Sequence, residues 1–432
     1  MRILFSIPVT PPAKTYGAER HHLTLIKAIK KLFGDDIFIF SYNAETIEDI
    51  WRSLLKGGMK TEESPYGTVY KFPVANVDNI LLNPLSAIAH KVMFIASHTR
   101  GFPDNLLRAL TILSDFYLLR AGYTYSSLVR EYLEKIQPEI VHVYGIHLFW
   151  LPYILSRLVL RNNSAGLILW TIYHHFVRYE RYLFERPKIK NILSGADAII
   201  TSTHYEKSVI EGYISGNKNE IHVIPVPVDL ESFLNPPKEY CDKLREKLGN
   251  PDHIILTMTL NEDKGSLNVL RALIDLREKY NVVFVSFGRS RLEDLNKFNK
   301  LKNKLPNNVK AFYFGYVKEE TKALLYTIAD VFAMPSIADS FGMAYAEAWY
   351  YNTPVIADDN SVMREVIGNS RGLLVRRNNI EEIKTAIRTL IEDKTLARKL
   401  AENGKRYLYN ELDSLKVATK VRKLYEDVHI KE

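Results

Sequence analysis

Short runs of consecutive apolar residues recur along the chain, and they predict buried strands of a parallel sheet. Residues 3–7 and 36–41 are two such runs. Strands that are covered on both faces show this continuous pattern rather than alternation. Between them, residues 20–32 place apolar side chains at helical spacing, and Gly34 follows as a stop signal. Strand, loop, helix and strand in this order are typical of the opening of a parallel α/β sheet.

The same alternation continues and then restarts, which indicates two α/β units. In the first half we expect further strands at 139–145, 167–174, 197–202 and 221–229. In the second half we expect strands at 253–260, 282–288, 309–315, 331–336, 354–359 and 372–375, with helices between them. A chain of 432 residues is also too long for one hydrophobic core. We therefore predict two doubly wound domains rather than one large sheet.

The boundary between the domains is predicted where prolines cluster. These prolines are Pro225, Pro227, Pro236 and Pro237. We expect an N-terminal domain over 1–228 and a C-terminal domain over 229–408. The last segment, 409–432, is charged and helical in its pattern, and we expect it to return to the N-terminal domain.

Composition narrows the class of protein. Apolar residues make up 47% of the chain, and no window of about 20 residues is apolar enough to span a membrane. The N-terminus lacks the long apolar region and cleavage site of a signal peptide, so we expect a cytoplasmic protein. The single cysteine, Cys241, excludes a disulfide framework and a thiolate metal cluster. Few Cys and Gln beside many Lys, Glu, Ile and Tyr favour a heat-adapted source.

The formal net charge of +8 favours polyanionic partners, such as phosphate-bearing substrates or an anionic membrane face. Nucleic acid is another polyanion, but the chain carries no helix-turn-helix, zinc-finger or RNA-binding signature. We therefore expect no nucleic-acid partner. A lysine-rich surface without a specific partner is the plain alternative.

The most informative stretch is 335–357, which begins at a strand end and carries two acids, Asp339 and Glu347. Gly342 permits a tight turn, and 343–350 then follows as a helix. In doubly wound sheets ligands bind at the carboxyl ends of the strands, where a helix N-terminus attracts a diphosphate. Carboxylates accept hydrogen bonds from sugar hydroxyls, so the layout fits a nucleotide sugar. The alternative for an arbitrary acid pair is that Asp339 caps the helix and Glu347 lies on its solvated face.

This stretch resembles the retaining glycosyltransferases of family 4, which have the GT-B fold of two facing Rossmann-like domains with a cleft between them. The residues in step with the family hallmark are Pro335, Ser336, Asp339, Phe341, Gly342, Glu347, Thr353, Pro354 and Val355. The lead-in at 309–336 and the continuation at 363–375 also look like the family. In the first half the segments that resemble it are 17–31, 137–145, 195–210 and 223–233. The resemblance therefore spans nearly the whole chain.

The resemblance implies transfer of a sugar from a nucleotide-sugar donor to an acceptor hydroxyl, with the anomeric configuration retained and without a metal ion or other cofactor. Glu347 would bind the ribose, Asp339 would contact the transferred sugar, and Lys264 would neutralise the departing phosphate. A histidine after the strand at 167–174 would lie beneath the sugar. His174 is the first candidate and His175 the second, and a packed or solvated imidazole is the alternative. The implied donor-binding residues are Gly17, Lys264, Asp339, Ser340, Phe341, Gly342, Met343, Ala344 and Glu347.

Two departures from the family pattern affect the site. The first acid is Asp339 rather than Glu, which is one methylene longer. The position of a second phosphate-binding cation, an Arg in the family, is occupied by Thr259. Arg289 and Arg364 are candidates to compensate for it. These departures keep open a different class of protein, a catalytically weak nucleotide-sugar-binding or scaffold subunit of a glycosylation complex.

The acceptor is the least defined part of the expected reaction. We expect a glycan or a lipid-linked glycan. Residues 79–135 are rich in Leu, Ile, Phe and Tyr and include four arginines. The segment 105–121 could lie as a helix on a membrane and serve a lipid-linked acceptor, which would make the protein a peripheral membrane enzyme. The alternative is that this segment packs on the N-terminal sheet.

Overall fold

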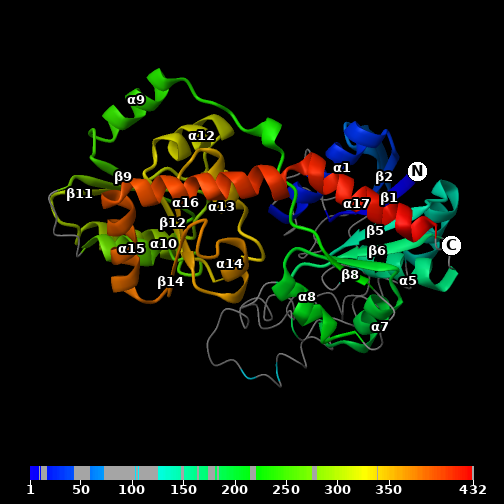
Figure 1. Cartoon of the computed structure of the whole chain (residues 1–432). Coiled ribbons are helices and arrows are strands. Elements are labelled where there is room, and N and C mark those ends of the chain that lie inside the picture. The colour runs from blue at the N-terminus through cyan, green and yellow to red at the C-terminus, as the bar shows by residue number, and fades with distance from the viewer. Residues whose placement is uncertain are drawn as a thin grey trace. The chain divides into compact units, whose positions relative to one another are not determined.

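The structure is a computed structural model, and the chain divides into two compact units. The described residues are 1–8, 10, 17–42, 59–72, 103, 106, 125–146, 150–162, 165–173, 181, 184–214, 220–274, 280–337 and 339–430. Unit 1 comprises Met1–Pro227 and Ser414–Glu432, and unit 2 comprises Val228–Asp413. Each unit has a sheet flanked by helices (Figure 1), which confirms the predicted class of two doubly wound α/β domains.

Unit 1 is built on an eight-stranded sheet with the order β3-β4-β2-β1-β5-β6-β7-β8. The strands are β1 (Arg2–Ser6), β2 (Asp36–Tyr42), β3 (Lys60–Ser64), β4 (Gly67–Phe72), β5 (Ile140–Tyr144), β6 (Gly166–Trp170), β7 (Ala198–Thr201) and β8 (Glu220–Val223). The helices are α1 (Gly17–Phe33), α5 (Trp150–Asn162), α7 (Pro187–Gly195), α8 (His204–Glu211) and α17 (Ser414–His429), and 125–136 is also helical. Every neighbouring pair is parallel except β3 and β4.

Alternate residues of the strands in unit 1 face two separate apolar layers. Ile3 and Phe5 of β1 pack with α1 and α17. Leu4 of the same strand points the other way and packs with α5 and α7. Burial on both faces is the reason that these strands read as continuous apolar runs in the sequence.

The C-terminal helix α17 belongs to unit 1, although all of unit 2 precedes it in the chain. It lies along α1 on one face of the sheet (Figure 1). Arg422 of α17 donates from Nε to Asp35 Oδ2 at 2.7 Å. The hydroxyl of Tyr425 is hydrogen-bonded to His142 Nδ1 of β5 at 2.5 Å. The last helix therefore completes the core beneath the first one.

Unit 2 contains a six-stranded parallel sheet with the order β11-β10-β9-β12-β13-β14. The strands are β9 (His253–Met258), β10 (Val282–Phe287), β11 (Val309–Tyr313), β12 (Val331–Met334), β13 (Val355–Asp358) and β14 (Leu373–Val375). The helices are α9 (Lys238–Lys247), α10 (Ser266–Ile274), α11 (Leu292–Lys302), α12 (Glu319–Ile328), α13 (Met343–Tyr350), α14 (Ser361–Val366), α15 (Ile380–Glu392) and α16 (Lys394–Tyr407). The direction of winding reverses between β9 and β12.

The two faces of the unit 2 sheet carry different partners. Val331 and Ala333 of β12 face an apolar core made with α10, α11, α15 and α16. Phe332 lies between them in sequence, and its ring meets those of Tyr326 in α12 and Tyr345 in α13, at centroid distances of 5.4 and 5.9 Å. The helices that carry the predicted motif are thus fixed to the sheet by large aromatic side chains.

Every strand predicted from the apolar runs occurs in the structure, but the hairpin of β3 and β4 was missed. The strand β3 has mostly exposed or half-buried residues, so it shows no apolar run. Ser64 and Gly67 pair across a two-residue turn, and Gly67 has a φ of 139°. A Cβ at Gly67 would lie 2.2 Å from the carbonyl oxygen of Ile37, so glycine is required here. The Pro-Tyr-Gly turn at 65–67 was the available signal.

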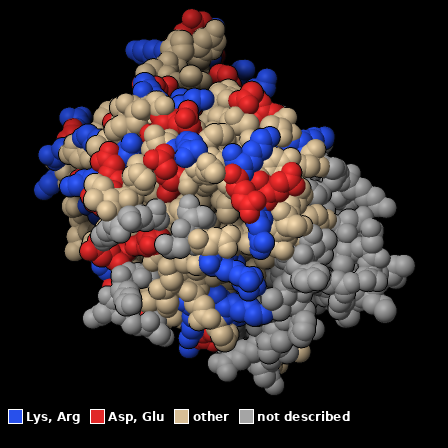
Figure 2. Space-filling view, turned by 90° about the vertical axis from the view of Figure 1, so that its right-hand side faces the viewer, with Lys and Arg blue, Asp and Glu red and all other residues tan. Residues whose placement is uncertain are grey.

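Surface charge in the described part of the chain is mixed. On the face shown in Figure 2, basic and acidic side chains are interspersed. No helix among the described residues is both long enough and apolar enough to cross a membrane. The predicted membrane-surface segment 105–121 lies outside the described residues, apart from Leu106.

Three buried imidazoles lie together in unit 1. The rings of His21 and His22 in α1 are 4.3 Å apart between centroids, and those of His22 and His142 are 5.8 Å apart. The ring of Trp170 lies 5.8 Å from that of His21. Burial, and then the neighbouring imidazoles, lower the pKa of His21 and the pKa of His142 well below the ordinary value. Both rings are therefore neutral in the folded protein at neutral pH.

We expect the protein to lose stability as the pH falls below about 6.5, the ordinary pKa of a histidine in an unfolded chain. Below that pH the unfolded chain takes up protons that the buried rings do not accept, which costs about 1.4 kcal/mol per pH unit for each ring. The urea concentration at which half of the protein is unfolded should therefore decrease when the pH is lowered from 7.5 to 5.5. His21→Phe keeps an aromatic ring but cannot titrate, so its midpoint should fall less. Equal losses in the two proteins would contradict a neutral His21 in the fold.

Candidate active site

Loops that follow three neighbouring strands meet at the carboxyl edge of the unit 2 sheet. The N–H of Ile337, after β12, donates to the carbonyl oxygen of Asp263, after β9, at 3.0 Å. The N–H of Leu260 donates to Ser290 Oγ, after β10, at 2.9 Å. Because the winding reverses between β9 and β12, this edge is the position at which doubly wound sheets bind ligands.

The loop after β9 is closed by hydrogen bonds to Ser266. Its Oγ donates to the carbonyl oxygen of Thr259 at 2.8 Å and accepts from the N–H of Asn261 at 2.8 Å. Thr259 itself has a φ of 58°, in the left-handed region. Gly265 has a φ of 72°, and a Cβ there would lie 2.4 Å from the carbonyl oxygen of Pro335. Glycine is needed at this position because the loop after β12 passes so close.

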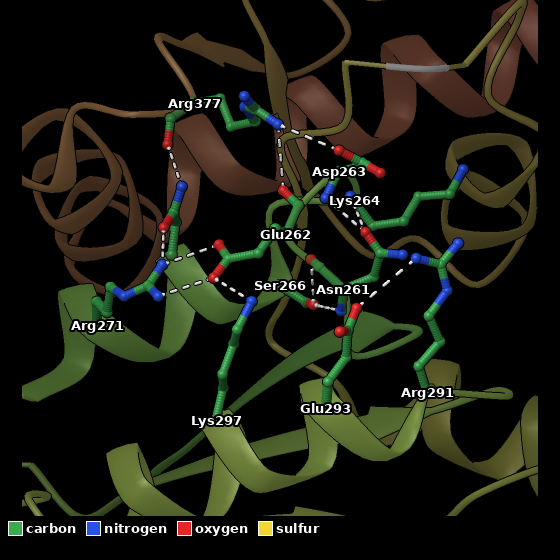
Figure 3. Close-up of polar contacts among 11 residues, drawn as sticks. Asn261, Glu262, Asp263, Lys264, Ser266, Arg271, Arg291, Glu293, Lys297 and Arg377 are labelled. Carbon is green, nitrogen blue, oxygen red and sulfur yellow. Dashed lines mark hydrogen bonds and ion pairs between the residues drawn. The ribbon is translucent and has the colours of Figure 1, made fainter. Parts of the chain in front are cut away.

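Charged side chains from three elements anchor the same loop (Figure 3). Glu262 accepts hydrogen bonds from both Nη atoms of Arg271 in α10, at 3.1 and 2.9 Å, and lies 3.6 Å from Lys297 Nζ in α11. Arg377, after β14, donates to the carbonyl oxygen of Glu262 at 3.2 Å. The hydrogen bond from Arg271 is the main cause that lowers the pKa of Glu262, so this carboxylate stays ionised. These contacts hold the loop in place independently of any ligand.

Lys264 and Asp339 form an ion pair, although 75 positions separate them in the chain. The distance from Lys264 Nζ to Asp339 Oδ1 is 2.6 Å, and the side chains are 26% and 14% exposed. Figure 3 shows the Lys264 side chain pointing away from Arg271 and Lys297. The structure thus brings together two residues that the sequence assigned to one donor site.

Gly342 is the N-cap of α13, with a φ of 86° and no side-chain cap. A Cβ at Gly342 would lie 2.5 Å from the ring of Tyr345. The Tyr345 hydroxyl donates to the carbonyl oxygen of Met334, and burial raises the pKa of Tyr345 well above its ordinary value. Gly342, rather than Asp339, is therefore the N-cap residue of this helix.

Glu347 lies in α13 and pairs with Lys322 of α12. Lys322 Nζ is 2.9 Å from Glu347 Oε1 and 2.7 Å from Glu319 Oε2. Burial acts to lower the pKa of Lys322, but the two carboxylates outweigh it and raise that pKa. The Glu347 side chain is only 19% exposed. The alternative in which Glu347 lies on a solvated helix face is therefore wrong.

Four of the other predicted donor residues adjoin Gly342 in the chain, and the fifth, Gly17, is in unit 1. Ser340 and the buried Phe341 lie between Asp339 and α13, whereas Met343 and Ala344 open the helix. In unit 1, Gly17 is the first residue of α1. Their roles toward a donor stay predictions.

Two of the remaining candidates, Arg289 and Arg364, contact other side chains. Arg289 lies over the ring of Tyr316, at 5.7 Å from its centroid. Arg364 forms a two-bond ion pair with Asp359, at 2.6 and 3.0 Å, so its charge is already engaged. His174 and His175 lie outside the described residues. Within the described chain, no group of three or more His, Cys, Asp or Glu side chains could hold a metal ion.

Sequence reasoning missed two charged residues that shape the site, Lys322 and Arg377. Lys322 follows Glu319 by three positions, which is the spacing of neighbours on a helix surface. That spacing was a visible signal, but the pairing with Glu347 depends on how α12 packs beside α13. Arg377 follows a short strand, and nothing in the sequence relates it to a loop 115 positions earlier.

Profiles of two protein families match the chain. The Glycosyltransferase Family 4 profile matches residues 81–232, and the profile of glycosyl transferases group 1 matches residues 242–407. The chain is also 23% identical over 421 residues to an uncharacterised glycosyltransferase of Methanocaldococcus jannaschii, which covers 95% of this chain and 94% of that protein. The chain belongs to the family 4 glycosyltransferases.

Other relatives of this glycosyltransferase agree with its fold. An alpha-monoglucosyldiacylglycerol synthase of Streptococcus pneumoniae is 26% identical over 267 residues, 58% of each chain. The solved sucrose-phosphate synthase of Thermosynechococcus elongatus matches with a TM-score of 0.70 at 17% identity, over 100% of both chains. An Anabaena protein in complex with UDP and glucose matches with a TM-score of 0.65 at 15% identity, over 99% of this chain and 100% of that one. The glycosyltransferase therefore has the GT-B fold.

We expect Gly342→Ala to lower both the thermal midpoint and the affinity for a nucleoside diphosphate. The new Cβ would press on the Tyr345 ring in addition to the backbone strain, which is about 1–2 kcal/mol for a left-handed residue. Gly315→Ala is the matched control, because Gly315 has a φ of 66° but nothing within 4 Å of the added carbon. If calorimetry gives equal losses for the two variants, the contact with Tyr345 is not what excludes a side chain.

Proposed function

We propose that this glycosyltransferase transfers a sugar from a nucleotide-sugar donor to an acceptor hydroxyl, with retention of the anomeric configuration and without a metal ion or other cofactor. The observation that carries the proposal is the pairing of Lys264 with Asp339 directly before the start of α13. The Anabaena structure that holds UDP and glucose supports a nucleotide sugar as the donor class.

The donor diphosphate would lie between Lys264 and the N–H groups at the start of α13. A helix N-terminus carries partial positive charge, and the lysine adds a full charge. When the bond between the sugar and the phosphate breaks, negative charge builds up on the leaving phosphate. Lys264 would stabilise that charge, which is the work that a divalent ion does in other phosphate sites.

We expect the ion pair of Lys264 with Asp339 to open when the donor binds. A phosphate oxygen competes with Asp339 for the lysine ammonium. Once Lys264 binds the phosphate, the Asp339 carboxylate can accept a hydrogen bond from a hydroxyl of the transferred sugar. We assign Asp339 this role despite its shorter side chain, because the pair already places it within 2.6 Å of the phosphate-binding lysine.

The remaining roles follow from the same arrangement. Glu347 would accept from the ribose hydroxyls, and His174, with His175 as the second candidate, would lie beneath the sugar. Ser340, Phe341, Met343 and Ala344 would line the diphosphate, and Gly17 stays a proposed donor-binding residue. Attack from the face that the nucleotide leaves keeps the configuration. The acceptor hydroxyl forms the new bond to the sugar carbon and passes its proton to an oxygen of the leaving phosphate.

For the acceptor we propose a glycan or a lipid-linked glycan, with peripheral contact to a membrane. The name of the Streptococcus pneumoniae relative contains a diacylglycerol, which supports a lipid-bearing acceptor. The net charge of +8 suits an anionic membrane surface. The relatives described above are transferases and synthases by name, so we favour an enzyme over a binding subunit.

The donor is tested by incubating the protein with UDP-, GDP- and ADP-sugars and measuring the nucleoside diphosphate that is released, with and without a lipid extract. We expect release from one class of donor and faster release when lipid is present. Release of nucleoside diphosphate at the same rate with and without lipid would point to a glycan acceptor. Binding of a nucleoside diphosphate without release from any donor would contradict an enzyme and favour the binding subunit.

Lys264→Ala should lower turnover of the active donor by about 100-fold, the usual loss when one group that stabilises transition-state charge is removed. Lys297→Ala is the control, since Lys297 Nζ lies 3.6 Å from Glu262 of the same loop, whereas the partner of Lys264 is Asp339. Initial rates and circular dichroism of both variants are the measurements. Unaltered turnover in Lys264→Ala would rule out its role at the phosphate.

A further inference from the structure

We propose that Lys322 is a positioning residue of the donor site, which orients the Glu347 carboxylate so that one oxygen is occupied and the other is presented to the ribose hydroxyls. The inference rests on the proposed role of Glu347. It adds a residue that sets how strictly the enzyme requires a ribonucleotide.

The geometry of Lys322 leaves it little freedom. Its Nζ lies between Glu347 Oε1, at 2.9 Å, and Glu319 Oε2, at 2.7 Å. The Lys322 side chain is 14% exposed, so its carbon chain is packed rather than free in water. A lysine whose ammonium bridges two fixed carboxylates cannot swing to another place without breaking both contacts.

The two carboxylates that Lys322 bridges are not equivalent. Glu319 belongs to the same helix, three positions earlier, and is 50% exposed. Glu347 comes from α13 and is 19% exposed. The contact within α12 is an ordinary surface pair of modest strength. The contact to α13 neutralises a carboxylate that has lost most of its water, and it also ties together the two helices that hold the motif.

The groups around Glu347 make Lys322 its source of positive charge. Tyr326 is hydrogen-bonded to this carboxylate and Tyr351 lies near it. Burial and the nearby negative charge raise the pKa of both tyrosines, so both stay neutral. Glu319 adds a second negative charge. A bound diphosphate would add more. Without Lys322 the carboxylate would lose the positive charge that holds its orientation.

A Glu347 carboxylate that has turned away from this orientation would bind the ribose differently. An ionised carboxylate only accepts hydrogen bonds, so it pairs well with two neighbouring hydroxyl donors. A site built to pair with a hydroxyl discriminates strongly against the analogue that lacks it. Loss of the orientation given by Lys322 should therefore lower the preference for ribose over 2′-deoxyribose, not just the overall affinity.

The test compares Lys322→Met, Lys322→Arg and the control Lys384→Met by titration calorimetry. Lys384 pairs with Glu381 Oε2 at 2.7 Å, also three positions earlier in a helix of unit 2, and is 20% exposed. The control therefore removes an ion pair of the same geometry and spacing outside the motif. The probes are UDP, GDP and ADP. The nucleotide that the wild type binds most tightly is then compared with its 2′-deoxy form.

We expect Lys322→Met to weaken binding of the ribonucleotide by about tenfold, the usual worth of one charge-assisted hydrogen bond, and to weaken the 2′-deoxy form much less. Lys322→Arg should restore part of the discrimination, and Lys384→Met should keep all of it.

Equal weakening of the ribonucleotide and the 2′-deoxy form, without recovery of the discrimination in Lys322→Arg, would show a merely structural lysine and overturn the inference. The proposed function would survive that result, because the wild type would still bind and discriminate. If the wild type binds none of the three nucleotides, the proposed function fails and this inference fails with it. Should Lys322→Met not fold, Lys322→Gln takes its place, since it keeps a polar side chain without the charge.

Discussion

The pairing of β9 with β12 is the constraint on which the candidate site depends. These strands are neighbours in the sheet although β10, β11 and three helices separate them in the chain. Their parallel direction carries both following loops to the same edge, where the N–H of Ile337 meets the carbonyl oxygen of Asp263. The ion pair of Lys264 with Asp339 exists only because of that register. The sheet therefore determines where the candidate site lies, and the loops supply its side chains.

Each acid of the motif has a lysine from another part of the chain as its partner. Lys264 pairs with Asp339 and Lys322 pairs with Glu347. Between the two pairs lies the start of α13, with its own partial positive charge. Each acid of the motif thus has a cation beside it, although Lys322 also pairs with Glu319, so a diphosphate bound here would meet less repulsion than two unpaired acids would exert. An unbalanced pair of acids would work against binding of the same anion.

Most strands and several residues of the candidate site could be predicted from the sequence. The strands and residues that were missed have physical reasons. Continuous apolar runs predicted twelve of the fourteen strands that the described residues form, because burial on both faces leaves that pattern. The edge strand β3 is exposed or half-buried, and in β4 the polar residues Thr68 and Lys71 interrupt the apolar ones, so neither strand shows a continuous apolar run. In the site, Asp339, Gly342 and Glu347 could be found because they lie in one short segment with a glycine turn. Lys322 could not be connected to Glu347, since that contact depends on the packing of two helices.

The return of α17 to unit 1 affects how the chain folds as it is made. Unit 2 is one continuous stretch, whereas unit 1 needs segments from both sides of it. A ribosome releases α17 only after all of unit 2 has emerged, and domains generally fold as units during synthesis. The half begun first is therefore finished last. Until Tyr425 reaches His142, apolar surface beneath α1 stays open, so removal of the final helix would damage the opposite end of the sequence.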